Sequence, residues 1–201
     1  MSYNMALGKY LSKLADRTPV PGGGSAAALA AALGAALISM TAKYDLGKAK
    51  DKYAKKKIRE ISDFSEKALR RLELLMQKDG KAYLKLAKEI KKRRPKKLLR
   101  LYKDAISVPM EVCNIAARAA SDAAELSGYS KTSIISDAAE AAVLLESAFF
   151  SAKLNVEVNL RSIEAAAYKK KVKSALNRAE KKAIKAKKAA LASAAAFLKR
   201  G

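Results

Sequence analysis

The chemistry open to this chain is limited first by the side chains that it lacks. Its 201 residues include no histidine and a single cysteine, Cys113. Histidine is the side chain that most often transfers protons near neutral pH, so proton transfer here would fall to aspartate, glutamate, lysine, tyrosine or water. The sequence offers no cluster of cysteine and histidine that could hold zinc, and we expect no bound metal.

A glycine-rich loop precedes the most apolar segment of the chain. Pro19-Val20-Pro21 favours extended backbone, because each proline fixes its own φ and biases the preceding residue away from helix. Gly22-Gly23-Gly24 follows, and Ser25 is predicted to cap a helix that runs to about Tyr44. Backbone N–H groups at such a helix start can bind a carboxylate or a ring carbonyl. A tight turn that only permits close helix packing would give the same pattern.

Three carboxylates accompany breaks or starts in the helical pattern. Asp79 precedes a glycine, Glu111 lies close to Pro109, and Asp137 stands where a helix is predicted to begin. A buried carboxylate can stabilise a cation or receive a proton from attacking water. Each also has a structural interpretation. Asp79 could be exposed at a helix break, Asp137 could complement a helix dipole, and Glu111 could pair with Arg118.

Two amide side chains, Asn155 and Asn159, are four residues apart and therefore share one helix face. Amides carry both donors and acceptors, which suits the edge of a heterocyclic ring. The pair could instead bind loop backbone or cross a dimer interface. Because burying a polar group without a partner costs a few kcal/mol, we expect the glycine loop, the asparagine pair and an aspartate to meet in one cleft.

These residues must be positioned by helices. Alanine, leucine, lysine and glutamate dominate the composition, and apolar residues recur at helical spacing with no strand-period segment of useful length. We predict an all-α fold, a single-domain bundle of about six helices spanning residues 1–201, with a break at Asp79-Gly80 and a loop at 127–130. The predicted helices cover approximately residues 3–15, 25–44, 50–92, 96–126, 136–168 and 171–198.

The apolar run from Ala26 to Met40 is shorter than the roughly 20 residues that span a bilayer. A signal peptide fits poorly, because Asp16 and the prolines and glycines that follow it occupy the place of a plain basic region. We therefore expect no membrane association and a cytoplasmic location. The run should form a core helix at the centre of the bundle or at a homodimer interface, next to the similarly apolar segment from Ala138 to Ala152.

The chain is strongly basic, with 42 lysines and arginines against 19 acidic residues and a net charge of +23. The basic residues concentrate in segments 48–57, 91–103 and 169–188, which we interpret mainly as solvated helix faces. Attraction of a polyanionic ligand remains an alternative, and the cluster Lys91 to Arg94 is the densest candidate. Nucleic acid is a less favoured partner, because the sequence has few aromatic residues and no recognisable DNA-binding motif.

Four blocks of the sequence together resemble the cyclodeaminase/cyclohydrolase family, which includes formiminotransferase-cyclodeaminases and methenyltetrahydrofolate cyclohydrolases. The blocks are Pro19 to Leu29, Asp79 to Tyr83, Val108 to Cys113, and Ser136-Asp137 with Asn155 to Leu160. They follow the order and spacing of the family. The resemblance extends from about Leu7 to Leu160, and it implies an all-α bundle that dimerises.

The resemblance also implies an activity. Family members hydrolyse 5,10-methenyltetrahydrofolate to 10-formyltetrahydrofolate, or close 5-formiminotetrahydrofolate with loss of ammonia. No formimino-transferring domain accompanies the blocks, so we expect the cyclohydrolase reaction, with a tetrahydrofolate derivative as the substrate. The cyclodeaminase reaction is the first alternative, and a non-catalytic basic protein that binds nucleic acid is the second.

By the same resemblance, Asp79 and Asp137 are the expected catalytic residues. The residues expected to bind the substrate are Pro21, Gly22, Gly23, Gly24, Ser25, Glu111, Asn155 and Asn159.

Overall fold

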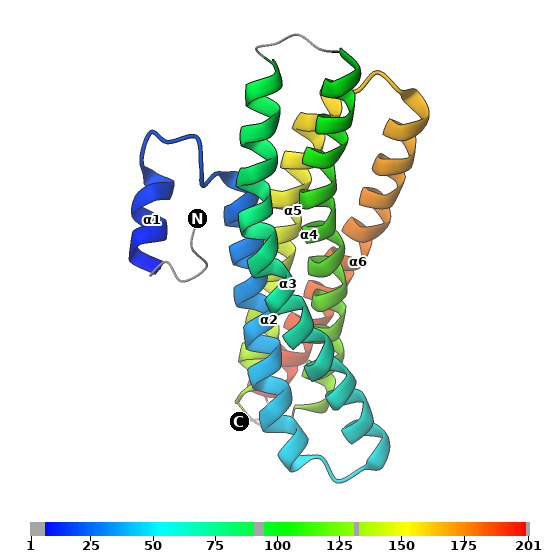
Figure 1. Cartoon of the computed structure of the whole chain (residues 1–201). Coiled ribbons are helices and arrows are strands. Elements are labelled where there is room, and N and C mark those ends of the chain that lie inside the picture. Colours follow the sequence, from blue (N-terminus) through cyan, green and yellow to red (C-terminus); the bar gives the residue numbers. More distant parts are fainter. Residues whose placement is uncertain (1–6, 91–94, 131–132, 200–201) are drawn as a thin grey trace.

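The computed structural model of the chain describes residues 7–90, 95–130 and 133–199, and within these ranges it contains only helices and their connections. The predicted all-α fold is confirmed. Figure 1 shows the long helices side by side and the short first helix outside them. The helices are α1 (Leu7–Ala15), α2 (Gly23–Lys48), α3 (Lys52–Ile90), α4 (Pro95–Tyr129), α5 (Ile135–Arg161) and α6 (Ala166–Leu198).

Consecutive long helices run in opposite directions, as short connections between neighbours require (Figure 1). One consequence is decisive for the site. The start of α2 and the ends of α3 and α5 lie at the same end of the bundle. The glycine-rich loop, Asp79 and the asparagine pair belong to these three segments, so residues far apart in sequence meet there.

The core forms around α2, which packs against α3, α4 and α5. By length and composition alone α2 could cross a membrane, but 61% of its apolar window is buried within the bundle, as expected of a core helix. Small residues let α2 and α5 approach closely. A Cβ atom at Gly34 would lie 2.6 Å from Cγ of Leu145. The predicted placement of the run from Ala26 to Met40 beside the apolar half of α5 is thus confirmed.

One predicted interruption does not exist, because α3 continues through Asp79-Gly80. The break predicted at 127–130 is real but begins later, since α4 continues through Gly128 to Tyr129 and α5 begins at Ile135. At Gly80 the reason is tertiary packing. A Cβ there would lie 3.4 Å from a methyl of Val20, so the loop before α2 rests on this side of α3. Such contacts override the weak helix propensity of glycine.

One real break was not predicted. The segment expected to be one helix from 136 to 168 is divided between α5, which ends at Arg161, and α6, which begins at Ala166. The connection contains neither proline nor glycine, the usual signals of a helix end. Ile163, within it, is fully buried, and the N–H groups of Ser162 and Ile163 bond to the last carbonyls of α5.

Candidate active site

The start of α2 is capped by a side chain from another helix. The helix begins at Gly23, with Gly22 as its extended N-cap residue and no capping side chain of its own. Ser25 was predicted to be the cap, but it lies inside the first turn. Its backbone N–H donates to Oδ2 of Asp79 on α3, at 3.1 Å. A carboxylate here satisfies an orphan N–H and sits at the positive end of the helix dipole.

The absent side chain of Gly24 makes this contact possible. A Cβ atom at Gly24 would overlap the carboxylate of Asp79. Partial burial raises the pKa of Asp79 above its ordinary value, and the hydrogen bond from the Ser25 N–H opposes that rise. The carboxyl group is therefore held at a fixed place with an increased affinity for a proton.

Asp79 faces a cleft of about 490 Å³ at this end of the bundle. The glycine loop forms one wall and α5 contributes the asparagine pair. The amide of Asn155 lies 3.6 Å from where a Cβ on Gly23 would be. Residues from α3, α4 and α5 complete the lining, which consists of Thr18, Pro19, Val20, Gly22, Gly23, Gly24, Asp79, Ala82, Tyr83, Leu86, Ala105, Leu154, Asn155, Val158 and Asn159.

The two amides are oriented by the helix that carries them. Nδ2 of Asn155 donates to the carbonyl of Ser151 at 2.9 Å, and Nδ2 of Asn159 donates to the carbonyl of Asn155 at 3.0 Å. One of the two N–H donors of each amide is thus used within α5. The two Oδ1 atoms remain as acceptors in the cleft, which suits a ligand edge that carries N–H groups.

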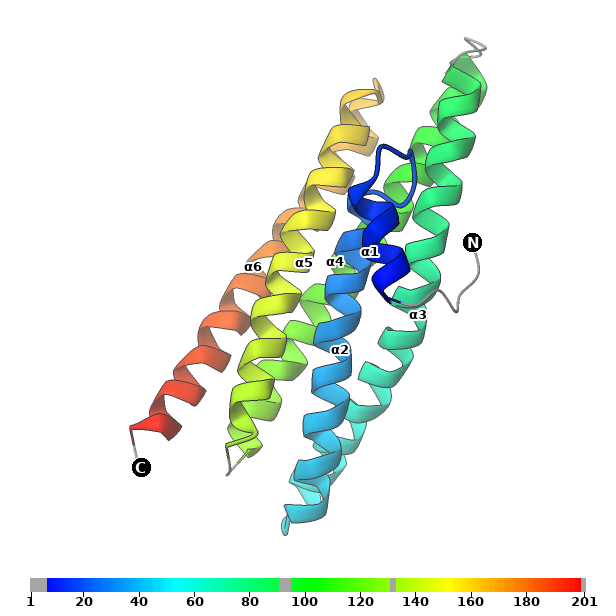
Figure 2. The same ribbon diagram turned by 90° about the vertical axis from the view of Figure 1, so that its left-hand side faces the viewer.

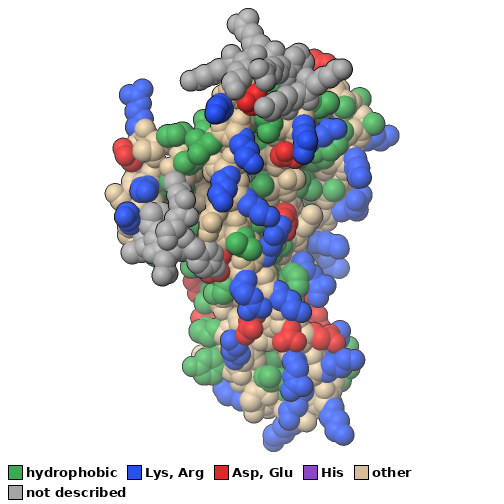
Figure 3. Space-filling view, in the orientation of Figure 1, with side chains coloured by type: hydrophobic (Ala, Val, Ile, Leu, Met, Phe, Trp, Pro, Cys, Tyr) green, Lys and Arg blue, Asp and Glu red, His purple; other side chains and the backbone are tan. Residues whose placement is uncertain are grey.

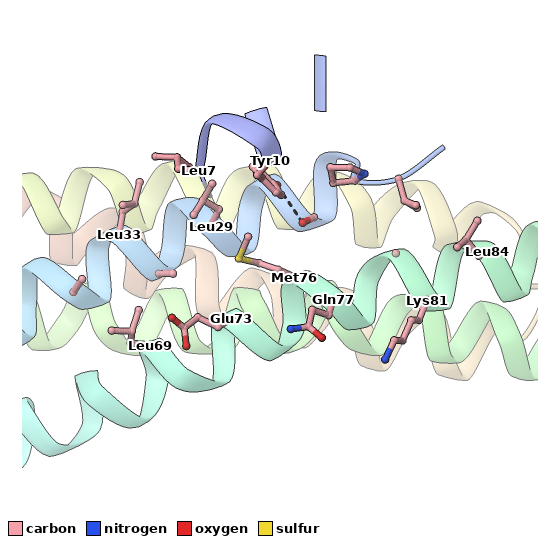
Figure 4. Close-up of a pocket in the computed structure, with 16 residues that line it drawn as sticks. Leu7, Tyr10, Leu29, Leu33, Leu69, Glu73, Met76, Gln77, Lys81 and Leu84 are labelled. Carbon is pink, nitrogen blue, oxygen red and sulfur yellow. Dashed lines mark hydrogen bonds between the residues drawn. The ribbon is translucent and has the colours of Figure 1, made fainter. Parts of the chain in front are cut away.

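Pro21 and Ser25 line a second cavity, of about 430 Å³, between α1, α2 and α3. Figure 4 shows its largely apolar lining, including Leu29 and Met76, and the hydroxyl of Tyr10, which donates to Oγ of Ser25 at 3.1 Å. Sequence reasoning missed Tyr10, because at its helical spacing it counts as one more apolar position of α1. Tyr10 is buried, and its hydroxyl links α1 to Ser25, the residue whose N–H donates to Asp79.

Two predicted site residues lie elsewhere. Asp137 is in the first turn of α5, eighteen residues before Asn155. At 1.5 Å per residue this places it about 27 Å away along the helix. Glu111 forms a bidentate ion pair with Arg71, with N···O distances of 2.5 and 2.7 Å. Its anticipated partner Arg118 instead pairs with Asp122. The structure therefore brings Asp79, and not Asp137 or Glu111, to the cleft.

Within the part of the chain that the structure describes, no group of three acidic or cysteine side chains could hold a metal ion. The basic cluster Lys91 to Arg94 lies outside the described residues.

Known proteins resemble this chain both in the arrangement of helices and in amino-acid sequence. A family model described as formiminotransferase-cyclodeaminase matches residues 6–178. The chain belongs to this family. The crystal structure of formiminotetrahydrofolate cyclodeaminase from Thermotoga maritima superposes with a TM-score of 0.92 at 26% identity, covering 97% of this chain and 98% of the other. The family match ends inside α6, whereas the fold match includes nearly the whole chain.

Two curated members of the family differ in length. Methenyltetrahydrofolate cyclohydrolase from Methylorubrum extorquens is 32% identical over 178 residues, which are 84% of this chain and 85% of that protein. Formimidoyltransferase-cyclodeaminase from Rattus norvegicus is 28% identical over 177 residues, but the match spans only 33% of its length. The family resemblance inferred from the four sequence blocks is confirmed.

Proposed function

We propose that the chain is a folate one-carbon enzyme that hydrolyses 5,10-methenyltetrahydrofolate to 10-formyltetrahydrofolate. The observation that carries the proposal is the meeting of Asp79, the glycine loop and the asparagine pair in one cleft. The relative named for this reaction is matched over most of its length, which supports the choice.

The methenyl carbon of this substrate belongs to a cation delocalised over N5 and N10. Water adds to that carbon while Asp79 accepts the proton, giving a neutral tetrahedral adduct. Asp79 then returns the proton to N5 as the bond between N5 and the carbon breaks, and the hydroxyl of the adduct loses its proton to solvent. One water is consumed and one proton is released. Burial raises the pKa of Asp79 toward the working pH, which suits a group that both accepts and returns a proton.

Substrate binding uses the remaining walls of the cleft. The Oδ1 atoms of Asn155 and Asn159 accept N–H groups of the pterin, and apolar side chains from α3 and α5, including Tyr83 and Val158, pack against the rings. The first turn of α2 directs backbone N–H groups toward the negative parts of the ligand. Ser25 and Pro21 shape this turn from behind.

The cyclodeaminase reaction is the second candidate, favoured by the likeness to the Thermotoga maritima protein. In that reaction N10 attacks the formimino carbon and loses its proton, and the departing nitrogen leaves as ammonia after it has received that proton and one more from the enzyme. The same carboxyl group, protonated at the start, would be the donor. The two reactions therefore demand opposite initial protonation states of Asp79, which makes them separable by experiment.

We further propose that the active form is a cytoplasmic homodimer. Exposed apolar side chains form a stripe on α2 and a second on α5, and these helices are neighbours (Figure 2). We call this surface the α2/α5 stripe. Its members are Leu33, Met40, Tyr44 and Val143, and it ends at Leu154 and Val158, which line the cleft. Exposed apolar rows of this kind are typical of oligomer interfaces. The lone buried thiol of Cys113 fits a reducing compartment.

The purified protein should be incubated with 5,10-methenyltetrahydrofolate, and the loss of its chromophore followed against buffer. A parallel reaction with 5-formiminotetrahydrofolate would reveal the cyclodeaminase by appearance of the same chromophore. Asp79→Asn should reduce kcat about a hundredfold or more, equivalent to roughly 2 to 4 kcal/mol of transition-state stabilisation, in a protein that remains folded. Rates equal to buffer in both assays would reject the enzymatic proposal.

A further inference from the structure

The first half of α6 presents a basic face without a single carboxylate. Eight residues at helical spacing line a shallow groove of about 660 Å³ along this helix. From the first to the last of them the face is about 22 Å long, at 1.5 Å per residue. We call it the α6 basic face, and its members are Ala166, Lys169, Lys170, Lys173, Ser174, Asn177, Arg178 and Lys181.

None of the five cations on this face forms an ion pair with any described residue. The contact made by Arg178 is with the neutral Oγ of Ser174, at 2.8 Å. Two other lysines around α6, Lys187 and Lys153, are neutralised. Lys187 pairs with Glu146 at 2.5 Å, and Glu180 of α6 turns to Lys153 on α5 at 2.8 Å. Like charges three and four residues apart destabilise a helix, so a bound polyanion would relieve this repulsion.

The net charge alone does not explain an acid-free face. The basic segment at the start of α3 also lines a shallow hollow, but there Glu60 and Asp63 stand among the cations Lys52, Lys55 and Arg59. In Figure 3, basic side chains follow the edge of the molecule formed by the first half of α6, with little acidic surface between them. The two segments therefore carry cations at a similar density and differ in whether carboxylates stand among them.

We propose that the α6 basic face binds the phosphate backbone of double-stranded nucleic acid without reading its sequence. A straight row of cations complements a regular row of phosphates. The face has no aromatic member on which unpaired bases could stack, which favours a duplex over a single strand. It contributes no residue to the cleft, so this binding is separate from the folate reaction.

The α6 basic face points outward, because the opposite side of the helix is packed in the core. Val172, Leu176 and Ala179 are buried in the core, where α6 packs against α4 and α5. A helix whose apolar side is held in the core cannot insert that side into a lipid surface, as interfacial amphipathic helices do. This geometry favours a polyanion that approaches from solvent, and it presents all five cations together.

The test is binding of a fluorescently labelled DNA duplex of about 15 base pairs, roughly twice the length of the face, measured by anisotropy across a range of NaCl concentrations. Five phosphate contacts predict a slope of about −4.5 for log K against log salt. The variant Lys173→Gln/Arg178→Gln/Lys181→Gln should reduce the magnitude of this slope by about 2.7. The matched control, Lys52→Gln/Lys55→Gln/Arg59→Gln, removes the same number of charges from α3 and should reduce it by less than about 1.

Folate turnover should be the same in the wild type and both variants, which separates this proposal from the enzymatic one. Absence of duplex binding at low salt would overturn it. Equal losses in the two triple variants would also overturn it, because binding would then follow net charge. Tighter binding of an unpaired strand, or binding of anionic phospholipid vesicles with none of duplex DNA, would assign the face to a different partner.

Discussion

Asp79 combines a structural contact with the chemistry proposed for it. Its carboxylate accepts the N–H of Ser25 and faces the cleft. The two roles act in opposite directions on its proton affinity, because the hydrogen bond favours the charged form and burial favours the neutral form. Burial is the larger effect, and the pKa is raised.

The raised pKa predicts the pH dependence of the cyclohydrolase reaction. Asp79 must be ionised to accept a proton from water, so kcat should fall as pH drops through the folded-state pKa. The midpoint of this acid limb should lie above about 4, the ordinary value for aspartate. Stopped-flow or steady-state rates across the acidic range would measure it. The residual rate of Asp79→Asn should lack the limb, and an unchanged limb in that variant would assign it to another group.

Gly24 tests whether the exact position of the carboxylate matters. Gly24→Ala introduces a methyl group into the space of the Asp79 carboxylate and should displace it. A displacement of about 1 Å at a reacting group can cost about a hundredfold in rate, so kcat should fall by that order. Gly47→Ala is a control on the same helix, because a Cβ at Gly47 meets nothing within 4 Å. Equal activity in both variants would remove Asp79 from the reaction.

At the residue scale, the sequence identified those site residues that are polar groups within apolar segments. The glycine loop, Asp79 and Asn155 interrupt apolar helices, and the structure places them together. It could not find Tyr10, since a tyrosine on an apolar helix face predicts packing and not a hydrogen bond. Nor could it exclude Asp137, because its place at the far end of α5 depends on which helix ends share one end of the bundle.

Among the elements, α2 and α5 approach each other closely at Gly34. Gly34→Leu would force a side chain against Leu145 and the carbonyl of Ala141. Overpacking of this kind costs about 1 to 3 kcal/mol or more, so the melting temperature should fall by several degrees. Thermal unfolding followed by circular dichroism would measure it, with Gly47→Ala as the control. A wild-type melting temperature in Gly34→Leu would contradict this packing.

The α4 helix carries a buried carboxyl group whose titration should affect stability. Burial raises the pKa of Asp122 to about 6, although Arg118 opposes the rise. The folded state thus binds this proton more tightly than the unfolded chain does. Its stabilising contribution is complete below about pH 4 and is lost as pH rises through about 6, a change of about 2 to 3 kcal/mol.

Asp122→Asn should therefore be more stable than the wild type at pH 7 and equal to it near pH 4. Arg118 is largely exposed, so losing its charged partner leaves it solvated at little cost. Urea unfolding at a series of pH values would measure the difference. Glu66→Gln, at an exposed carboxylate, is the control. A variant less stable than the wild type at pH 7 would show that the ion pair with Arg118 outweighs burial.

Helix identity was readable from sequence because long periodic segments are a strong signal, whereas two kinds of boundary were not. Gly80 suggested a break that does not occur, since its contact with Val20 supports the helix, and the break predicted around Gly128 begins two residues after it. The break after Arg161 carries no glycine or proline. It is specified by the burial of Ile163, which depends on the tertiary fold.

At the scale of the whole molecule, the exposed α2/α5 stripe predicts the oligomeric state. Met40→Glu/Tyr44→Glu places two charges on this surface, away from the cleft residues, and should convert a dimer to a monomer. Ile184→Glu/Leu191→Glu is the control, since these exposed apolar residues lie on α6. Light scattering coupled to size-exclusion chromatography would distinguish the outcomes. A dimer that survives the first variant would place the interface elsewhere.

The cap that Asp79 provides to α2 also constrains how this site can change. A substitution at position 79 must keep an acceptor for the Ser25 N–H, or the start of a core helix loses a hydrogen bond at the same step as the protein loses its proposed base. Stability and catalysis cannot be optimised separately at this position. Asparagine and glutamate are the nearest replacements that retain an acceptor oxygen, and glutamate must fit an additional methylene beside Gly24. We therefore expect few viable mutational routes to a new chemistry through this residue, and more through the lining of the cleft on α5.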